Sequence, residues 1–230
     1  EIINYLILEK DVKAVVIACN TATSAALDYV KSKFKIPIFG MIDSAAKKAV
    51  QMSNKQRIAV IGTEGTVNSQ AYQNAIKKMD KESRIFSKAC PKFVELVEEG
   101  KFSGREVRKT AENYLNSLIK ADVDSLILGC THFPYLTPVL AEVMGDDVQL
   151  INPAHEMALE VKKKLKEHDL LKLFLGDREE IKGEHNFIVS DKDRISHQFL
   201  EHGRRFLELE NLEFKEDNIF VHEKIREAIK

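Results

Sequence analysis

The sequence lacks long apolar runs, an excess of one charge and closely spaced cysteine pairs. No apolar run approaches the ~20 residues that a membrane-spanning helix needs, so we predict no membrane partner. The 230 residues hold 35 Lys and Arg against 36 Asp and Glu, and the longest basic run is 162–164. A near-neutral chain without basic clusters is not expected to bind nucleic acid.

The N-terminus carries neither an initiator Met nor the basic region of a secretory signal peptide, since the sequence opens EIIN. We therefore expect no signal peptide, and we expect further sequence upstream. The chain is large and contains three cysteines, an odd number that cannot all pair in disulfides within it. Free thiols in the reducing cytoplasm fit that count, so we predict a cytoplasmic location.

Short apolar runs alternate with amphipathic stretches along the chain. We predict strands at 14–18, 36–40, 57–61, 84–89, 125–128, 148–151 and 186–189. We predict helices at 22–34, 67–79, 105–120, 138–144, 154–166 and 193–206, with Thr137 as the N-cap of the fourth. This alternation predicts the α/β class, with mostly parallel sheets flanked by helices. The charged tail from 210 to 230 fits no element clearly.

Two segments, 15–21 and 126–132, share one construction. Each is an apolar strand that ends in a small residue, followed by a cysteine and two polar residues before a helix. Ligands of open parallel sheets bind beyond the carboxyl ends of the strands. We therefore predict two similar lobes, 1–42 with 152–230 and 43–151, with the active site in the cleft between them.

Cys19 and Cys130 stand where backbone N–H groups and a helix dipole favour negative charge. Buried cysteines often only fill space, and for Cys90, outside the repeat, we expect that role. The matching pair favours function. His132 could activate Cys130 as a nucleophile, whereas a redox pair or a zinc site would place its cysteines closer together. We predict no metal.

The turn GTEGT at 62–66 follows a strand and opens a helix. It lacks the Gly-Lys-Ser/Thr ending of a phosphate-binding P-loop. Its hydroxyl and N–H groups could instead bind a carboxylate at the helix N-terminus, although a plain tight turn needs no ligand.

Four segments together resemble the glutamate racemases of the aspartate/glutamate racemase superfamily. They are ACNTA at 18–22, IGTEGT at 61–66, CPKFVELVEEG at 90–100 and GCTHFP at 129–134. In softer form the similarity extends to about residue 214. It thus covers nearly the whole chain.

The resemblance implies an isomerase that interconverts L- and D-glutamate without a cofactor and supplies D-glutamate for peptidoglycan synthesis, and hence for cell wall and cell shape. It also implies a homodimer. In that family Cys19 would act on the D-isomer and Cys130 on the L-isomer, with His132 assisting Cys130 and Glu98 as an auxiliary acid. Substrate contacts would come from Asn20, Thr21, Thr63, Thr66, Thr131 and His132.

The sequence departs from the family pattern at its start. The Asp-Ser-Gly and Pro-Tyr-Gly segments of the family are absent, and with them the Asp that pairs with the first cysteine. If the molecule began at Glu1, we would expect little or no activity.

Three other functions stay open. An aspartate racemase or related two-cysteine racemase is the nearest, although such enzymes typically carry Glu at the position of His132. A two-lobed amino-acid-binding protein without catalytic activity is the second. A thiol hydrolase acting through Cys130 is the third.

Overall fold

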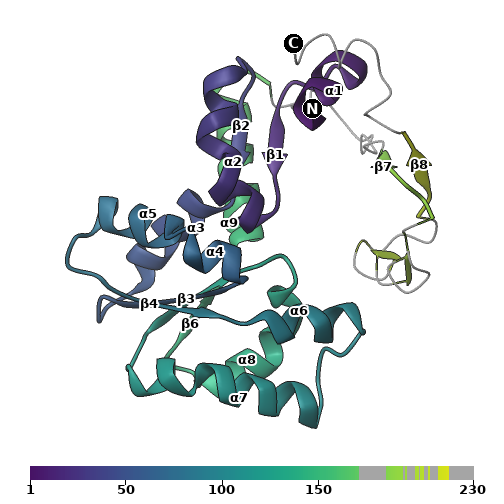
Figure 1. Cartoon of the computed structure of the whole chain (residues 1–230). Coiled ribbons are helices and arrows are strands. Elements are labelled where there is room, and N and C mark those ends of the chain that lie inside the picture. The colour runs from purple at the N-terminus through teal and green to yellow at the C-terminus, as the bar shows by residue number, and fades with distance from the viewer. Residues whose placement is uncertain are drawn as a thin grey trace, which may run out of the picture. The chain divides into compact units, whose positions relative to one another are not determined.

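A computed structural model describes residues 1–170, 185–193, 195, 200–201, 203–204, 207 and 212–217 (Figure 1). The chain forms two compact units. The larger unit is Ala14–His168, and the smaller combines Glu1–Lys13 with Asp169–Lys230. All the predicted site residues belong to the larger unit.

The larger unit contains two parallel sheets. The four-stranded sheet has the order β4 (Arg84–Ala89), β3 (Arg57–Gly62), β5 (Ser125–Gly129) and β6 (Gln149–Ile151). The second sheet pairs β1 (Val15–Ile17) with β2 (Ile38–Gly40). Parallel strands with helical connections confirm the predicted α/β class.

Helices cover both faces of the four-stranded sheet because successive side chains of a strand point to opposite faces. Ile58 and Val60 of β3 pack with α3 (Ile42–Met52) and α5 (Ala71–Met79). Ala59 and Ile61 pack on the other face. The helices there are α6 (Pro91–Glu98), α7 (Arg105–Lys120) and α8 (Thr137–Met144), with the 3₁₀ helix η1 (Phe133–Leu136). Figure 1 shows the two helical layers above and below this sheet.

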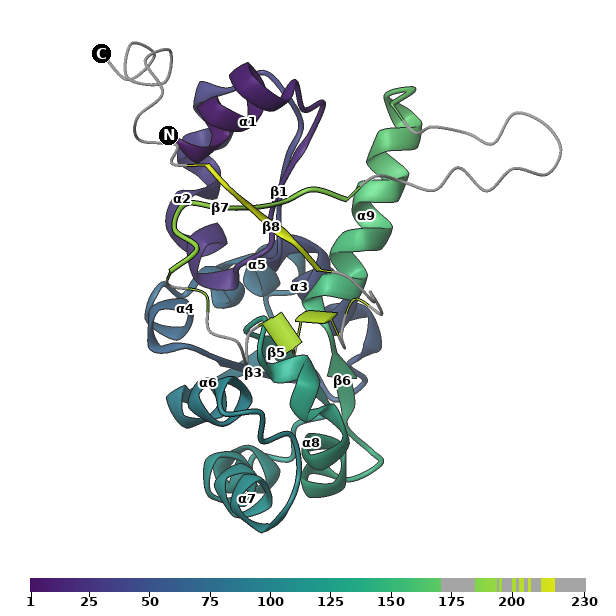
Figure 2. The same cartoon turned by 90° about the vertical axis from the view of Figure 1, so that its right-hand side faces the viewer.

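Two helices link the two sheets of the larger unit. Helix α2 (Asn20–Lys33) packs on β1 and β2 and also contacts α4 (Glu64–Asn68), which follows β3. Helix α9 (Pro153–Glu167) continues from β6 and contacts both α3 and β2. Figure 2 shows α9 above β6. The first turns of α2 and α4 are thereby held close together.

The smaller unit contains α1 (Ile2–Lys10) and the parallel strands β7 (Phe187–Val189) and β8 (Phe214–Glu216). Tyr5 of α1 is buried against Leu6 and Ile188, and its hydroxyl donates to Asp217. Within the described ranges, none of the helices combines the length and the hydropathy that crossing a bilayer requires.

Most predicted elements in residues 1–170 are confirmed, and the strand 84–89 and the helix 105–120 have the predicted bounds. The structure differs from the predicted elements in three places. The helix predicted at 67–79 is interrupted, because Gln70 adopts a left-handed conformation with φ 56° between α4 and α5. Thr137 does not cap α8; its hydroxyl donates to the carbonyl oxygen of Pro134. Helices α3 and α6 were not predicted from the sequence; they are short and rich in Ala or charged residues.

At the C-terminal end, β8 lies in the tail that fitted no predicted element. Much of the helix predicted at 193–206 lies outside the described residues. The division into lobes 1–42 with 152–230 and 43–151 stays a prediction. It would separate the two-stranded sheet from the four-stranded sheet.

Candidate active site

The carboxyl ends of β3 and β5 bring two predicted site segments to the same sheet edge. Gly62 pairs with Gly129 at the end of these adjacent parallel strands. Thr63 and Cys130 follow directly. The hydroxyl turn and the second thiol therefore begin at neighbouring positions.

Cys19 stands at the N-cap of α2. Its Sγ accepts a hydrogen bond from the backbone N–H of Ala22 at 3.5 Å, and the residue is exposed. The first backbone N–H groups of a helix have no acceptor within the helix, and an N-cap side chain can accept a hydrogen bond from one of them. The predicted position of this thiol, between a strand and a helix N-terminus, is confirmed.

Three threonine hydroxyls connect α2 to α4. Oγ1 of Thr21 lies 2.8 Å from that of Thr63 and 3.0 Å from that of Thr66. Thr63 also caps α4, because its Oγ1 accepts from the backbone N–H of Thr66 at 3.2 Å. The structure thus brings together hydroxyl groups from residues more than 40 positions apart. They form a threonine cluster at the N-termini of α2 and α4.

Cys130 lies in a different setting from Cys19. It is only 7% exposed, and the segment after it is the 3₁₀ helix η1 instead of the α-helix that the repeat predicted. Its Sγ is 3.6 Å from Nδ1 of His132, whose Nε2 is 2.5 Å from Oε1 of Glu98. Glu98 is the last residue of α6. A thiol, an imidazole and a carboxylate therefore form one hydrogen-bonded chain.

The charge on His132 follows from this chain. Its hydrogen bond with Cys130 and, next, that with Glu98 raise the pKa of His132 to about 9, against the opposing effect of partial burial. His132 is therefore protonated at neutral pH. The remaining polar group nearby is Thr131, which is exposed and whose Oγ1 lies 3.4 Å from Nδ1 of the same ring.

Tyr72 is a site neighbour that the sequence analysis missed. This residue of α5 is fully buried, and its hydroxyl donates to Oδ1 of Asn20 at 2.6 Å. Burial, and next the charge of Asp43, raise the pKa of Tyr72 far above its ordinary value, so the hydroxyl keeps its proton. In the sequence, Tyr72 is one aromatic residue in an amphipathic helix, which predicts a core position and nothing more.

Cys90 fills space, as expected. It is completely buried in the core between the sheet and α6 and α7, and burial raises the pKa of its thiol to about 12. Among the described residues, no three His, Cys, Asp or Glu side chains lie together in a way that could hold a metal ion.

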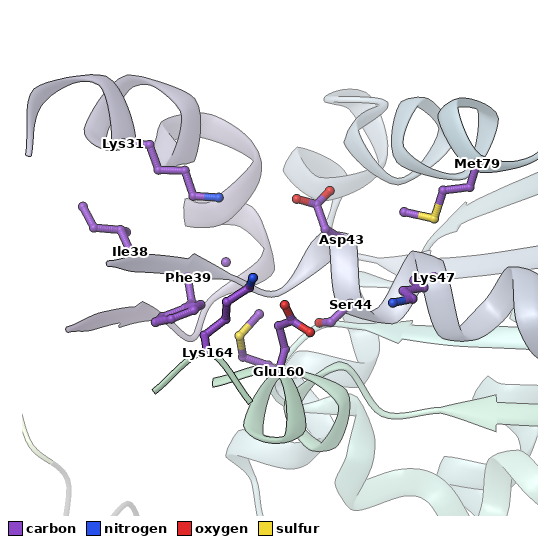
Figure 3. Close-up of a pocket in the computed structure, with 11 residues that line it drawn as sticks. Lys31, Ile38, Phe39, Asp43, Ser44, Lys47, Met79, Glu160 and Lys164 are labelled. Carbon is purple, nitrogen blue, oxygen red and sulfur yellow. The ribbon is translucent and has the colours of Figure 1, made fainter. Parts of the chain in front are cut away.

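A separate cavity of about 280 Å³ lies between α2, β2, α3 and α9 (Figure 3). Charged side chains of both signs line it, including Lys31, Asp43 and Glu160, together with Ser44. These side chains reach it from α2, α3 and α9, as Figure 3 shows. No predicted site residue lines this cavity.

Comparison with known proteins identifies the family. The model of the Asp/Glu/Hydantoin racemase family matches residues 1–161. A glutamate racemase of Geobacter metallireducens is 39% identical over 207 residues, which are 90% of this chain and 73% of that protein.

Solved structures agree. The glutamate racemase isoform of Bacillus anthracis superimposes with a TM-score of 0.84 at 30% identity, over 96% of this chain and 80% of that one. The glutamate racemase of Francisella tularensis in complex with D-glutamate gives 0.81 at 31%, over 93% and 76%. The predicted resemblance is confirmed, and the chain belongs to the Asp/Glu/Hydantoin racemase family.

Proposed function

We propose that this chain racemises glutamate without a cofactor, with Cys19 and Cys130 as the two bases. The observation that supports this most is the hydrogen-bonded chain from Cys130 through His132 to Glu98. The second thiol, Cys19, lies at the start of α2, which the threonine cluster connects to α4. Relatives named glutamate racemase agree with this substrate.

The reaction needs one thiolate and one thiol on opposite faces of the substrate. The thiolate removes the proton from Cα, and the opposite thiol donates its own proton to the other face of the resulting carbanion. The hydrogen count is unchanged, and the first sulfur ends as a thiol while the second ends as a thiolate. From the family, Cys19 acts on the D-isomer and Cys130 on the L-isomer.

The chemical difficulty is the weak acidity of Cα–H. An ordinary thiol has a pKa of about 8.5, and each unit of mismatch costs about 1.4 kcal/mol. Donors that point at the substrate carboxylate, where negative charge develops, lower this barrier. Asn20, Thr21 and Thr131, together with Thr63 and Thr66, are the donors that we assign to that role.

His132 and Glu98 serve the Cys130 half of the reaction. A protonated imidazole 3.6 Å from Sγ can stabilise a thiolate, because opposite charges in a partly buried site attract strongly. Glu98 holds the ring from its other nitrogen and supports the positive charge. We therefore assign His132 to substrate contact and to assistance of Cys130, and Glu98 to an auxiliary role.

We also propose the wider setting of this function. D-glutamate would supply peptidoglycan synthesis in the cytoplasm, and the active enzyme would be a homodimer with its site in the cleft between the predicted lobes.

Proton NMR in D₂O with L- or D-glutamate tests the proposal. We expect loss of the Cα–H signal together with loss of optical purity, from either isomer. Cys19→Ser and Cys130→Ser should each abolish racemisation of both isomers, whereas the control Cys90→Ser should keep it. Full activity of either site variant would exclude the two-base assignment.

Other outcomes identify the alternatives. Racemisation of aspartate in preference to glutamate would indicate a related two-cysteine racemase. Tight binding of glutamate without exchange at Cα would indicate an inactive binding protein. A covalent acyl adduct on Cys130, seen by mass spectrometry, would indicate a thiol hydrolase.

A further inference from the structure

Tyr72 lies between the two thiol-bearing turns and contacts both. On one side its hydroxyl donates to Asn20, the residue that follows Cys19. On the other side its ring packs against Gly129, the residue that precedes Cys130. A Cβ at Gly129 would lie 3.2 Å from Cε2 of the tyrosine ring. One side chain from α5 therefore contacts the backbone of one turn and the side chain of the other.

The contact with Gly129 leaves the Tyr72 ring and the Gly129 backbone little room to move. The same Cβ would also lie 2.7 Å from the carbonyl oxygen of Ile61, so only glycine fits between the ring and the neighbouring strand. Protein interiors transmit such displacements, because they are close-packed. A change in the position of the ring would therefore move the start of the Cys130 turn.

The contact with Asn20 determines which end of its carboxamide is available. Asn20 is 2% exposed, and Oδ1 already accepts from Tyr72. Within the described part of the chain, its Nδ2 makes no hydrogen bond. Because Tyr72 stays protonated and fixes the oxygen end, the amide N–H groups are left to donate to a ligand.

We propose that Tyr72 is a positioning residue that orients the Asn20 carboxamide toward the substrate carboxylate. This inference rests on the proposed function, in which Asn20 contacts the substrate. Tyr72 itself is buried and acts only through Asn20 and the Gly129 backbone. It has no counterpart in the motifs that the sequence analysis identified.

Tyr72→Phe in the full chain tests the inference, because it keeps the ring and removes only the hydroxyl. We expect KM for both isomers of glutamate to rise and kcat/KM to fall by about 10-fold, the size expected for one buried hydrogen bond to a group that contacts the substrate carboxylate. A merely structural role would lower the fraction of active protein, and hence kcat, without changing KM. Tyr114→Phe is the matched control: the Tyr114 hydroxyl accepts from the backbone N–H of Lys92 and contacts no proposed site residue.

A double-mutant cycle with Asn20→Ala gives the second measurement. If Tyr72 acts through Asn20, then Tyr72→Phe should leave KM unchanged in the Asn20→Ala background. An unchanged KM in the single variant, or additive effects in the double variant, would overturn the inference while wild-type racemisation stays intact. Absence of both turnover and D-glutamate binding in the wild-type chain would instead overturn the proposed function, and the inference with it.

Discussion

The charge of His132 is the residue-scale feature with the most direct chemical consequence. Its pKa of about 9 lies above the ordinary value of about 6.5, so between these values the folded chain holds a proton that the unfolded chain releases. The contribution of protonated His132 to the stability of the folded chain is therefore fully present below pH about 6.5 and is lost as the pH rises through about 9. Because the reaction at Cys130 is assigned to need the imidazolium, its rate should also fall as the pH rises through about 9.

Glu98→Gln tests this electrostatic dependence. Removing the carboxylate charge should lower the pKa of His132, so the basic limb of the kcat/KM profile should move to lower pH. The profile can be measured between about pH 6 and about pH 10 for both isomers. Glu95→Gln is the control, since Glu95 lies on the same helix but pairs with Lys92. An unchanged basic limb in Glu98→Gln would contradict the assignment.

Gly129 and Gly40 give a second residue-scale comparison. A Cβ at Gly129 would meet the backbone oxygen of Ile61 at 2.7 Å, whereas one at Gly40 would meet the side chains of Leu27 and Thr23 at 2.6 Å. The backbone of the central strand β3 cannot move aside as easily as a leucine methyl group can. We therefore expect Gly129→Ala to lower the free energy of unfolding by about 3 kcal/mol and Gly40→Ala by about 1 kcal/mol. Urea denaturation measures both, and a larger loss at Gly40 would contradict this reasoning.

At the scale of elements, the carboxyl and amino ends of the central strands have different roles. The carboxyl ends lead into the site, while a polar contact secures the amino ends. Asp124, 6% exposed, accepts hydrogen bonds from Oγ of Ser53 at 2.5 Å and from the backbone N–H of Lys55 at 2.6 Å. It therefore ties the loop between α3 and β3 to the start of β5.

Asp124→Asn should weaken this connection without changing the chemistry. An amide offers one acceptor in place of two and turns its NH₂ toward a donor, so we expect a loss of about 2 kcal/mol in the free energy of unfolding. Turnover per folded molecule should stay at the wild-type value, because the contact lies at the opposite edge of the sheet. Asp122→Asn, which breaks only an exposed ion pair with Lys55, should cost less than about 1 kcal/mol. Equal losses in the two variants would contradict the argument.

At the scale of the whole molecule, the proposed substrate groups come from elements that follow different sheets. Thr21 belongs to α2, which follows β1, whereas Thr63 and Thr66 lie after β3. A ligand that binds all three should stabilise the folded chain against unfolding by linkage.

D-glutamate at 100 times its Kd should therefore add about 2.7 kcal/mol to the free energy of unfolding and raise Tm by roughly 5–10 °C. Calorimetry with the Cys19→Ser variant measures this without turnover, and D-glutamine, which lacks the second carboxylate, is the comparison ligand. No shift with D-glutamate would contradict the proposed substrate.

The sequence by itself determined the α/β class and the two thiol-bearing turns. Both are local signals: β-branched apolar runs predict buried strands, and the residue after a strand end is specified by its neighbours in the chain. The site segments 18–22 and 129–134 were recognisable for the same reason. The break at Gln70 and the 3₁₀ turn after Cys130 were not, because they depend on packing around short segments.

Only the tertiary structure decided which distant groups meet. Glu98 reaches His132 across 34 positions, and Tyr72 reaches Asn20 across 52, with no periodicity that relates them. Such contacts follow from the order of strands in the sheet and from the helices that cover its faces. Tyr72 looked like any core aromatic in the sequence, because hydrophobic patterning records burial but not the partner of a buried hydroxyl.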